Sequence, residues 1–93
     1  MFKTNEYFDG KVKSIAFQTQ TLPATVGVMA VGDYVFNTAA KETMTVVSGS
    51  LSIKLAGEDT TTSYTTGESF EVAADSAFDV TVNEETAYLC VYG

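Results

Sequence analysis

Histidine is absent from this chain of 93 residues, and its absence limits the metal chemistry open to the protein. Zinc and iron sites depend largely on imidazole and thiolate ligands, and the chain offers only one cysteine in place of the missing imidazoles. Calcium takes oxygen ligands alone, but the carboxylates form no recognisable ligand cluster. We therefore expect no bound metal ion.

Arginine is also absent, and the formal net charge is −7. An acidic chain repels a phosphate backbone, which argues against a nucleic-acid polymer as partner. Without the bidentate guanidinium group, a small anion is left to lysine, hydroxyl and backbone N–H groups. The sequence thus favours a small-molecule ligand over a polymer.

Only one cysteine is present, so no disulfide can form within the chain. We expect Cys90 to be a small buried hydrophobe. No segment approaches the roughly 20 apolar residues that cross a bilayer, so we expect no membrane partner. The N-terminus is unlike a secretory signal, because Lys3 is followed by Asn5, Glu6 and Asp9 rather than by an apolar stretch. These features predict a cytoplasmic protein.

The length suits one domain, residues 1–93, whose stability margin is thin, because a chain of this size buries only roughly 60 to 65% of its unfolded surface. A second copy would add buried surface and protect the edge strands. We therefore expect a homodimer.

Short runs rich in valine, threonine and aromatic residues follow one another along the chain, separated by glycine, proline, aspartate and asparagine. The runs span residues 12–17, 24–31, 34–37, 44–47, 51–55, 60–65, 69–72, 78–82 and 87–92. Such a series predicts an all-β sandwich or small barrel. Residues 38–44 are too few for a stable helix, and Gly49 suggests a hairpin between runs 44–47 and 51–55.

The segment FNTAAKETMTVVSG has the spacing of the first cupin motif, H-x-H followed by Glu and later by Gly. Glu42 and Gly49 occupy the second half of that motif, whereas Phe36 and Thr38 stand where the histidines would be. GESFEVAADSAF follows the spacing of the second motif, with Phe78 at its histidine position. The sequence therefore predicts a single-domain, cupin-like (RmlC-like) jelly-roll barrel without its metal site.

In such a barrel Phe36, Thr38, Glu42 and Phe78 would point into one pocket. The two phenylalanines are either plain core residues or rings that stack on a ligand. Glu42 is either a solvated residue at the edge of a loop or a functional carboxyl, because burying an unpaired carboxylate costs free energy. Both alternatives stay open at this stage.

Five blocks along the chain resemble the pyrimidine/purine nucleoside phosphorylases of the cupin fold. They are NEYFDGKVKSIAF, VGVM, GDYVFNTA, ETMTVVSG and AYLCVYG. The resemblance implies that a nucleoside and inorganic phosphate are converted into a free base and a pentose 1-phosphate, without a cofactor. Ala73 departs from the proline expected in the second motif, which puts only a local turn in doubt.

This reaction needs a site for phosphate, stabilisation of an oxocarbenium-like transition state and a donor for the departing base. On that basis we expect Glu42, Thr38 and Tyr34 to be catalytic, and Phe36, Phe78, Tyr88, Lys11 and Lys13 to bind substrate. The two lysines share one strand face and are the phosphate candidates, or they form a solvated edge that discourages aggregation. The competing readings are a catalytically silent module that binds a nucleoside or sugar and, less favoured, a sugar-nucleotide isomerase, which would need a histidine base.

Overall fold

Ten β-strands form from the runs of β-branched and aromatic residues, in the computed structural model, which describes residues 1–93. The strands are β1 (Thr4–Tyr7), β2 (Val12–Gln18), β3 (Pro23–Met29), β4 (Gly32–Asn37), β5 (Glu42–Ser48), β6 (Ser50–Leu55), β7 (Thr62–Thr65), β8 (Ser69–Val72), β9 (Ala77–Val82) and β10 (Thr86–Tyr92). No helix in the structure has the length and apolar character that crossing a membrane requires. All ten elements of the structure are strands, which confirms the all-β prediction.

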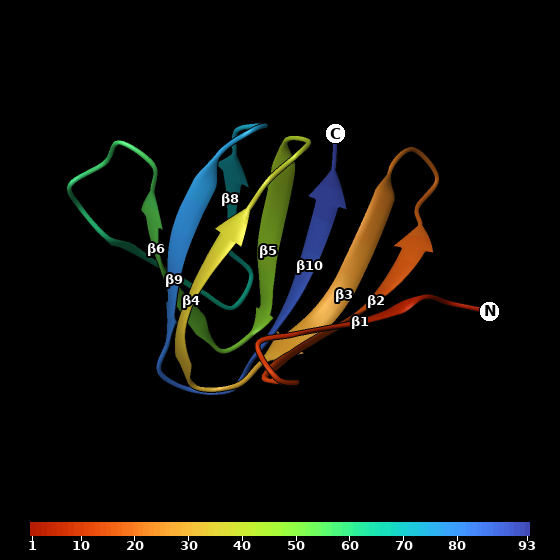
Figure 1. Ribbon diagram of the computed structural model, residues 1–93, viewed down its shortest axis with the longest axis horizontal. Helices are drawn as coiled ribbons and strands as arrows, with labels where there is room; N and C mark the ends of the chain where they lie inside the picture. Colours follow the sequence, from red (N-terminus) through yellow and green to blue (C-terminus); the bar gives the residue numbers. More distant parts are fainter.

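The strands assemble into two sheets that face one another. The larger sheet has the order β1-β2-β3-β10-β5-β8, and the smaller has the order β4-β9-β6-β7. In Figure 1, β6, β9 and β4 lie to the left and β3, β2 and β1 to the right, with β5 and β10 between them. The two sheets share no continuous hydrogen-bonded ring, so the jelly roll is an open sandwich.

The predicted hairpin at Gly49 is wrong, because β5 and β6 lie in different sheets. β5 pairs with β8 and β10, whereas β6 pairs with β7 and β9. Gly49 has a φ of +111°, which favours glycine, and it carries the chain across between the sheets. Val46 and Leu51 are both fully buried, so each strand puts an apolar face into the interior instead of pairing with the other.

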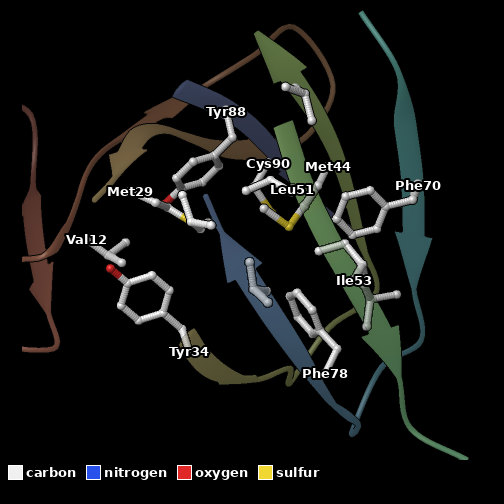
Figure 2. Close-up of a cluster of buried hydrophobic side chains, with 14 residues drawn as sticks. Val12, Met29, Tyr34, Met44, Leu51, Ile53, Phe70, Phe78, Tyr88 and Cys90 are labelled. Atoms are coloured by element: carbon white, nitrogen blue, oxygen red, sulfur yellow. The ribbon is translucent and has the colours of Figure 1, made fainter. Parts of the chain in front are cut away.

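The hydrophobic core lies between the two sheets. Along β8, β9 and β10, buried residues alternate with more exposed ones, as the two-residue period of a half-buried sheet requires. Figure 2 shows Met29, Met44, Tyr88 and Cys90 of the larger sheet pointing toward the same interior as Phe78 of the smaller sheet. Cys90 is buried and free, as predicted.

Candidate functional site

A cavity of about 510 Å³ lies between the two sheets and is the main candidate site. We call it the intersheet cavity. Twelve of its fifteen lining residues are hydrophobic, so it suits a neutral organic ligand better than a free anion. The smaller sheet, β1 and the turn after β1 supply aromatic rings, and strands β2, β5 and β10 supply most of the polar side chains.

The aromatic wall is built on a cross-strand pair. Phe36 of β4 and Phe78 of β9 are register partners, and their rings stack with centroids 5.7 Å apart and an interplanar angle of 27°. Phe8, from the turn after β1, meets Phe36 edge-on at 5.5 Å. Phe78 is buried in the core and Phe36 is half-buried, so the two predicted stacking residues differ in how much ring surface they offer.

Glu42 is the one charged residue that lines the cavity. It begins β5, where it lies opposite Tyr92 of β10. The Cys90 thiol donates a hydrogen bond to Glu42 Oε1 over 3.4 Å. Burial raises the pKa of Glu42 above the usual 4.5, and the Cys90 hydrogen bond partly opposes this effect. The carboxyl therefore keeps its proton to a higher pH than a surface glutamate does, which suits a proton donor.

Tyr88 lies on β10, which pairs with the strand that carries Glu42. It belongs to the polar side chains that line the cavity from β2, β5 and β10, which we call the polar wall. It faces Gly27 of β3, and Ser14 of β2 lies on the far side of that glycine. A Cβ on Gly27 would lie 2.8 Å from Tyr88 Oη, so the missing side chain makes room for the phenol. Burial raises the pKa of Tyr88 to about 12, against a lowering contribution from the Ser14 hydroxyl. The phenol is thus a neutral donor at physiological pH.

Two further residues of the polar wall were not predicted from the sequence. Tyr92 lines the cavity and its hydroxyl is 2.9 Å from Thr25 Oγ1. Cys90 was expected only to be buried, yet it also contacts Glu42; burial and the nearby Glu42 charge both raise the pKa of the Cys90 thiol. The alternation of Tyr88, Cys90 and Tyr92 along β10 is the signal that could have identified all three as sharing one face.

Two of the predicted catalytic residues do not line the cavity. Thr38 Oγ1 donates to Ala73 O at 2.7 Å and accepts from the Ser76 N–H at 2.9 Å, so its hydroxyl joins two loops. The Tyr34 hydroxyl donates to Ala30 O at 2.7 Å, and its ring packs against Phe8. Both hydroxyls bond to main-chain groups, and neither residue lines the cavity. The catalytic roles of Thr38 and Tyr34 therefore stay predictions, and the cavity geometry does not support them.

The two predicted phosphate-binding lysines lie elsewhere. Val12 and Ser14 point inward from the start of β2, so Lys11 and Lys13 point to the opposite, exposed face. They line a smaller hollow of about 350 Å³ that also includes Glu85, and Lys13 Nζ pairs with Glu6 at 3.4 Å. The structure therefore brings together Glu42, Phe36, Phe78 and Tyr88, but not the lysines.

No three cysteine, aspartate or glutamate side chains are grouped closely enough to hold a metal ion. Glu42 and Cys90 are the only pair of that kind in the cavity wall, and two donors are fewer than a zinc site needs. The arrangement is instead that of a largely apolar pocket with the Glu42 carboxyl on one wall and stacked rings on the other.

The comparisons with known proteins identify the family of this chain. A family model described as pyrimidine/purine nucleoside phosphorylase matches residues 2–92. A Cellvibrio japonicus (strain Ueda107) protein of that name is 62% identical over 92 residues, which are 99% of each chain. A crystal structure of a Vibrio parahaemolyticus protein of unknown function has a TM-score of 0.96 and 47% identity, covering 100% of this chain and 99% of that one.

The same fold also occurs in proteins of low sequence identity to this chain. An RmlC-like cupin from Shewanella frigidimarina has a TM-score of 0.76 at 18% identity, covering 98% of this chain and 82% of that one. Identity this low shows the fold alone, and it confirms the cupin-like jelly roll predicted from the motif spacing.

Proposed function

This chain belongs to the pyrimidine/purine nucleoside phosphorylase family, and from that premise we propose that it cleaves purine and pyrimidine nucleosides with inorganic phosphate. The products are the free base and the pentose 1-phosphate. The observation that carries the proposal is the placement of Glu42, with its raised pKa, across the intersheet cavity from the ring pair Phe36 and Phe78.

In the proposed reaction a phosphate oxygen forms a bond to the anomeric carbon of the pentose while the bond from that carbon to the base nitrogen breaks. The electron pair of the breaking bond stays with the base, and the Glu42 carboxyl donates a proton or a hydrogen bond to it. Glu42 regains its proton from phosphate or water. The Tyr88 phenol, neutral because of its pKa of about 12, is the second donor of the cavity wall.

The reaction as written needs no metal, because the charge changes fall on phosphate, the base and Glu42. We propose that activity persists after treatment with a chelator. The absence of a group of three candidate ligands supports that proposal.

A second function has one specific observation in its favour. No lysine lines the intersheet cavity, so the cavity itself offers no cation to a phosphate group. A module that binds nucleosides without converting them would need none. Turnover separates the two functions, because a binding module is stabilised by its ligand but releases no base.

We also propose that the working form is a homodimer. The outer face of the larger sheet carries Ile15 and Val26, which are cross-strand partners and are 44% and 42% exposed. Val28, 54% exposed, lies two residues from Val26 on the same strand. We call Ile15, Val26 and Val28 the outer apolar patch. A second copy placed on the patch would bury it, and Val26→Asp should convert the dimer to monomer in light scattering after size-exclusion chromatography.

The experiment that tests the function measures free base released from uridine, adenosine and inosine by chelator-treated protein, with and without inorganic phosphate. We expect release from both base classes, and only when phosphate is present. Absence of release from every nucleoside, by protein that is folded and assembled, would contradict the proposal and favour the binding module.

A further inference from the structure

The turn between β1 and β2 holds a bulky residue in a left-handed backbone conformation. Phe8 and Asp9 have φ angles of +54° and +57°, and the Gly10 N–H donates to Tyr7 O at 3.2 Å. Hairpin turns of this kind favour asparagine, aspartate or glycine at their two central positions. A phenylalanine there is strained, so the turn geometry does not explain why Phe8 is present.

The Phe8 ring is also only partly packed. It contacts the Tyr34 ring at 4.9 Å and the Phe36 ring at 5.5 Å, the latter with an interplanar angle of 83°. It nevertheless remains 42% exposed and lies outside the buried core cluster, while lining the intersheet cavity. Part of the ring therefore covers its two aromatic neighbours, and the remainder is available to a ligand in the cavity.

We propose that Phe8 is a further substrate-binding residue, against whose ring the nucleobase stacks. This inference rests on the proposed function. Every nucleobase presents a planar π face, so a stacking ring accepts purines and pyrimidines alike. Phe78 is buried and Phe36 half-buried, so Phe8, at 42% exposed, offers a ligand more ring surface than either phenylalanine of the cross-strand pair. The contacts with the Tyr34 and Phe36 rings hold the Phe8 ring at the cavity.

Steady-state kinetics give the first test. Phe8→Leu keeps an apolar side chain but removes the π face, so we expect the KM for adenosine to rise about tenfold while the KM for phosphate is unchanged. Phe8→Tyr should restore the adenosine KM to near the wild-type value. Asp9→Asn, at the neighbouring turn position, is the control and should leave both values unchanged. Equal adenosine KM values for wild type and Phe8→Leu would overturn the proposal.

A binding measurement separates this inference from the proposed reaction. The chain has no tryptophan, so Phe8→Trp introduces a single tryptophan at the stacking position, whose emission is recorded apart from that of the five tyrosines. We expect adenosine to quench its emission in a saturable way, whether or not the protein turns over. Phe17→Trp on β2, away from the cavity, is the control and should show no saturable quenching. If wild type releases base but Phe8→Trp shows no quenching, stacking on Phe8 is refuted; quenching without any base release would retain the stacking site and refute phosphorolysis.

Discussion

The Cys90 thiol and the Glu42 carboxyl meet across neighbouring strands, with Sγ donating to Oε1 over 3.4 Å, although 48 residues separate them in the sequence. Register pairs Cys90 with Met44 and places Glu42 opposite Tyr92, so thiol and carboxyl are diagonal neighbours on the inner face. The only sulfhydryl of the protein thus donates a hydrogen bond to the only charged residue in the cavity wall.

Removing the thiol should alter the pH dependence of the reaction. The Cys90 hydrogen bond lowers the pKa of Glu42, so Cys90→Ala should raise it. If Glu42 is the proton donor, the high-pH decline of kcat/KM then moves to higher pH. Cys90→Ser keeps a donor and should leave the decline near its wild-type position. If the high-pH decline of kcat/KM stays in place in Cys90→Ala, Glu42 is not the titrating acid.

Glu42 should also destabilise the protein once it ionises. Because burial raises its pKa in the folded state, the folded protein binds more protons than the unfolded chain between pH 4.5 and that raised pKa, and stability falls as pH rises through this window. Glu42→Gln cannot ionise, so its free energy of unfolding should match that of the wild type below pH 4.5 and exceed it at pH 7. Urea denaturation across the pH range measures the difference, and a wild type more stable than Glu42→Gln at pH 7 would contradict this account.

Gly27 provides a test of how the polar wall is assembled. In Gly27→Ala the new Cβ would lie 2.8 Å from Tyr88 Oη and 2.5 Å from Lys13 O, so we expect a loss of about 1–3 kcal/mol in unfolding free energy. Part of this loss should be recovered in the background of Tyr88→Phe, which lacks the hydroxyl. A double-mutant cycle that shows no coupling would mean that Tyr88 does not depend on the gap at Gly27.

Thr38→Val distinguishes a structural hydroxyl from a catalytic one. The substitution leaves Ala73 O without its donor and the Ser76 N–H without its acceptor, which should cost about 1–3 kcal/mol of stability. The structure favours a kcat within about twofold of wild type for the folded variant. A loss of 100-fold or more, typical of a missing catalytic proton-transfer group, would instead support the role predicted from the sequence.

Lys11→Ala and Lys13→Ala test the predicted phosphate site. The sequence predicts a higher KM for phosphate, whereas the placement of both side chains on the outer face predicts no change. Lys13→Ala also breaks the exposed pair with Glu6, which should cost less than about 1 kcal/mol. Lys54→Ala on β6 is a matched control for the loss of positive charge. A rise in the KM for phosphate in either variant, but not in the control, would support the phosphate-binding role predicted for the lysines.

The sequence predicted the fold well because most strands carry a strong local signal. The nine runs correspond to β2 to β10, and only β1 was missed. Its sequence TNEY is largely polar, and the strand lies at the edge of the sheet, where pairing with β2 and not burial determines its conformation. Gly49 was misread because a local turn signal does not reveal which sheet the next strand joins.

The candidate site was predicted in part. Motif spacing identified Glu42, Phe36 and Phe78, because alternation along a strand places such residues on one inner face. The contact between Glu42 and Cys90 depends on the pairing of β5 with β10, which local periodicity does not contain. The Phe8 ring belongs to a turn whose conformation is atypical for phenylalanine, so turn propensities point away from it.

The most direct test of the central claim is phosphorus NMR of chelator-treated protein incubated with adenosine and inorganic phosphate. Phosphorolysis predicts that the inorganic phosphate signal declines while a phosphate monoester signal grows, in one-to-one proportion to the adenine released. Adenine released together with free ribose, while the inorganic phosphate signal stays constant, would show hydrolysis and contradict the account.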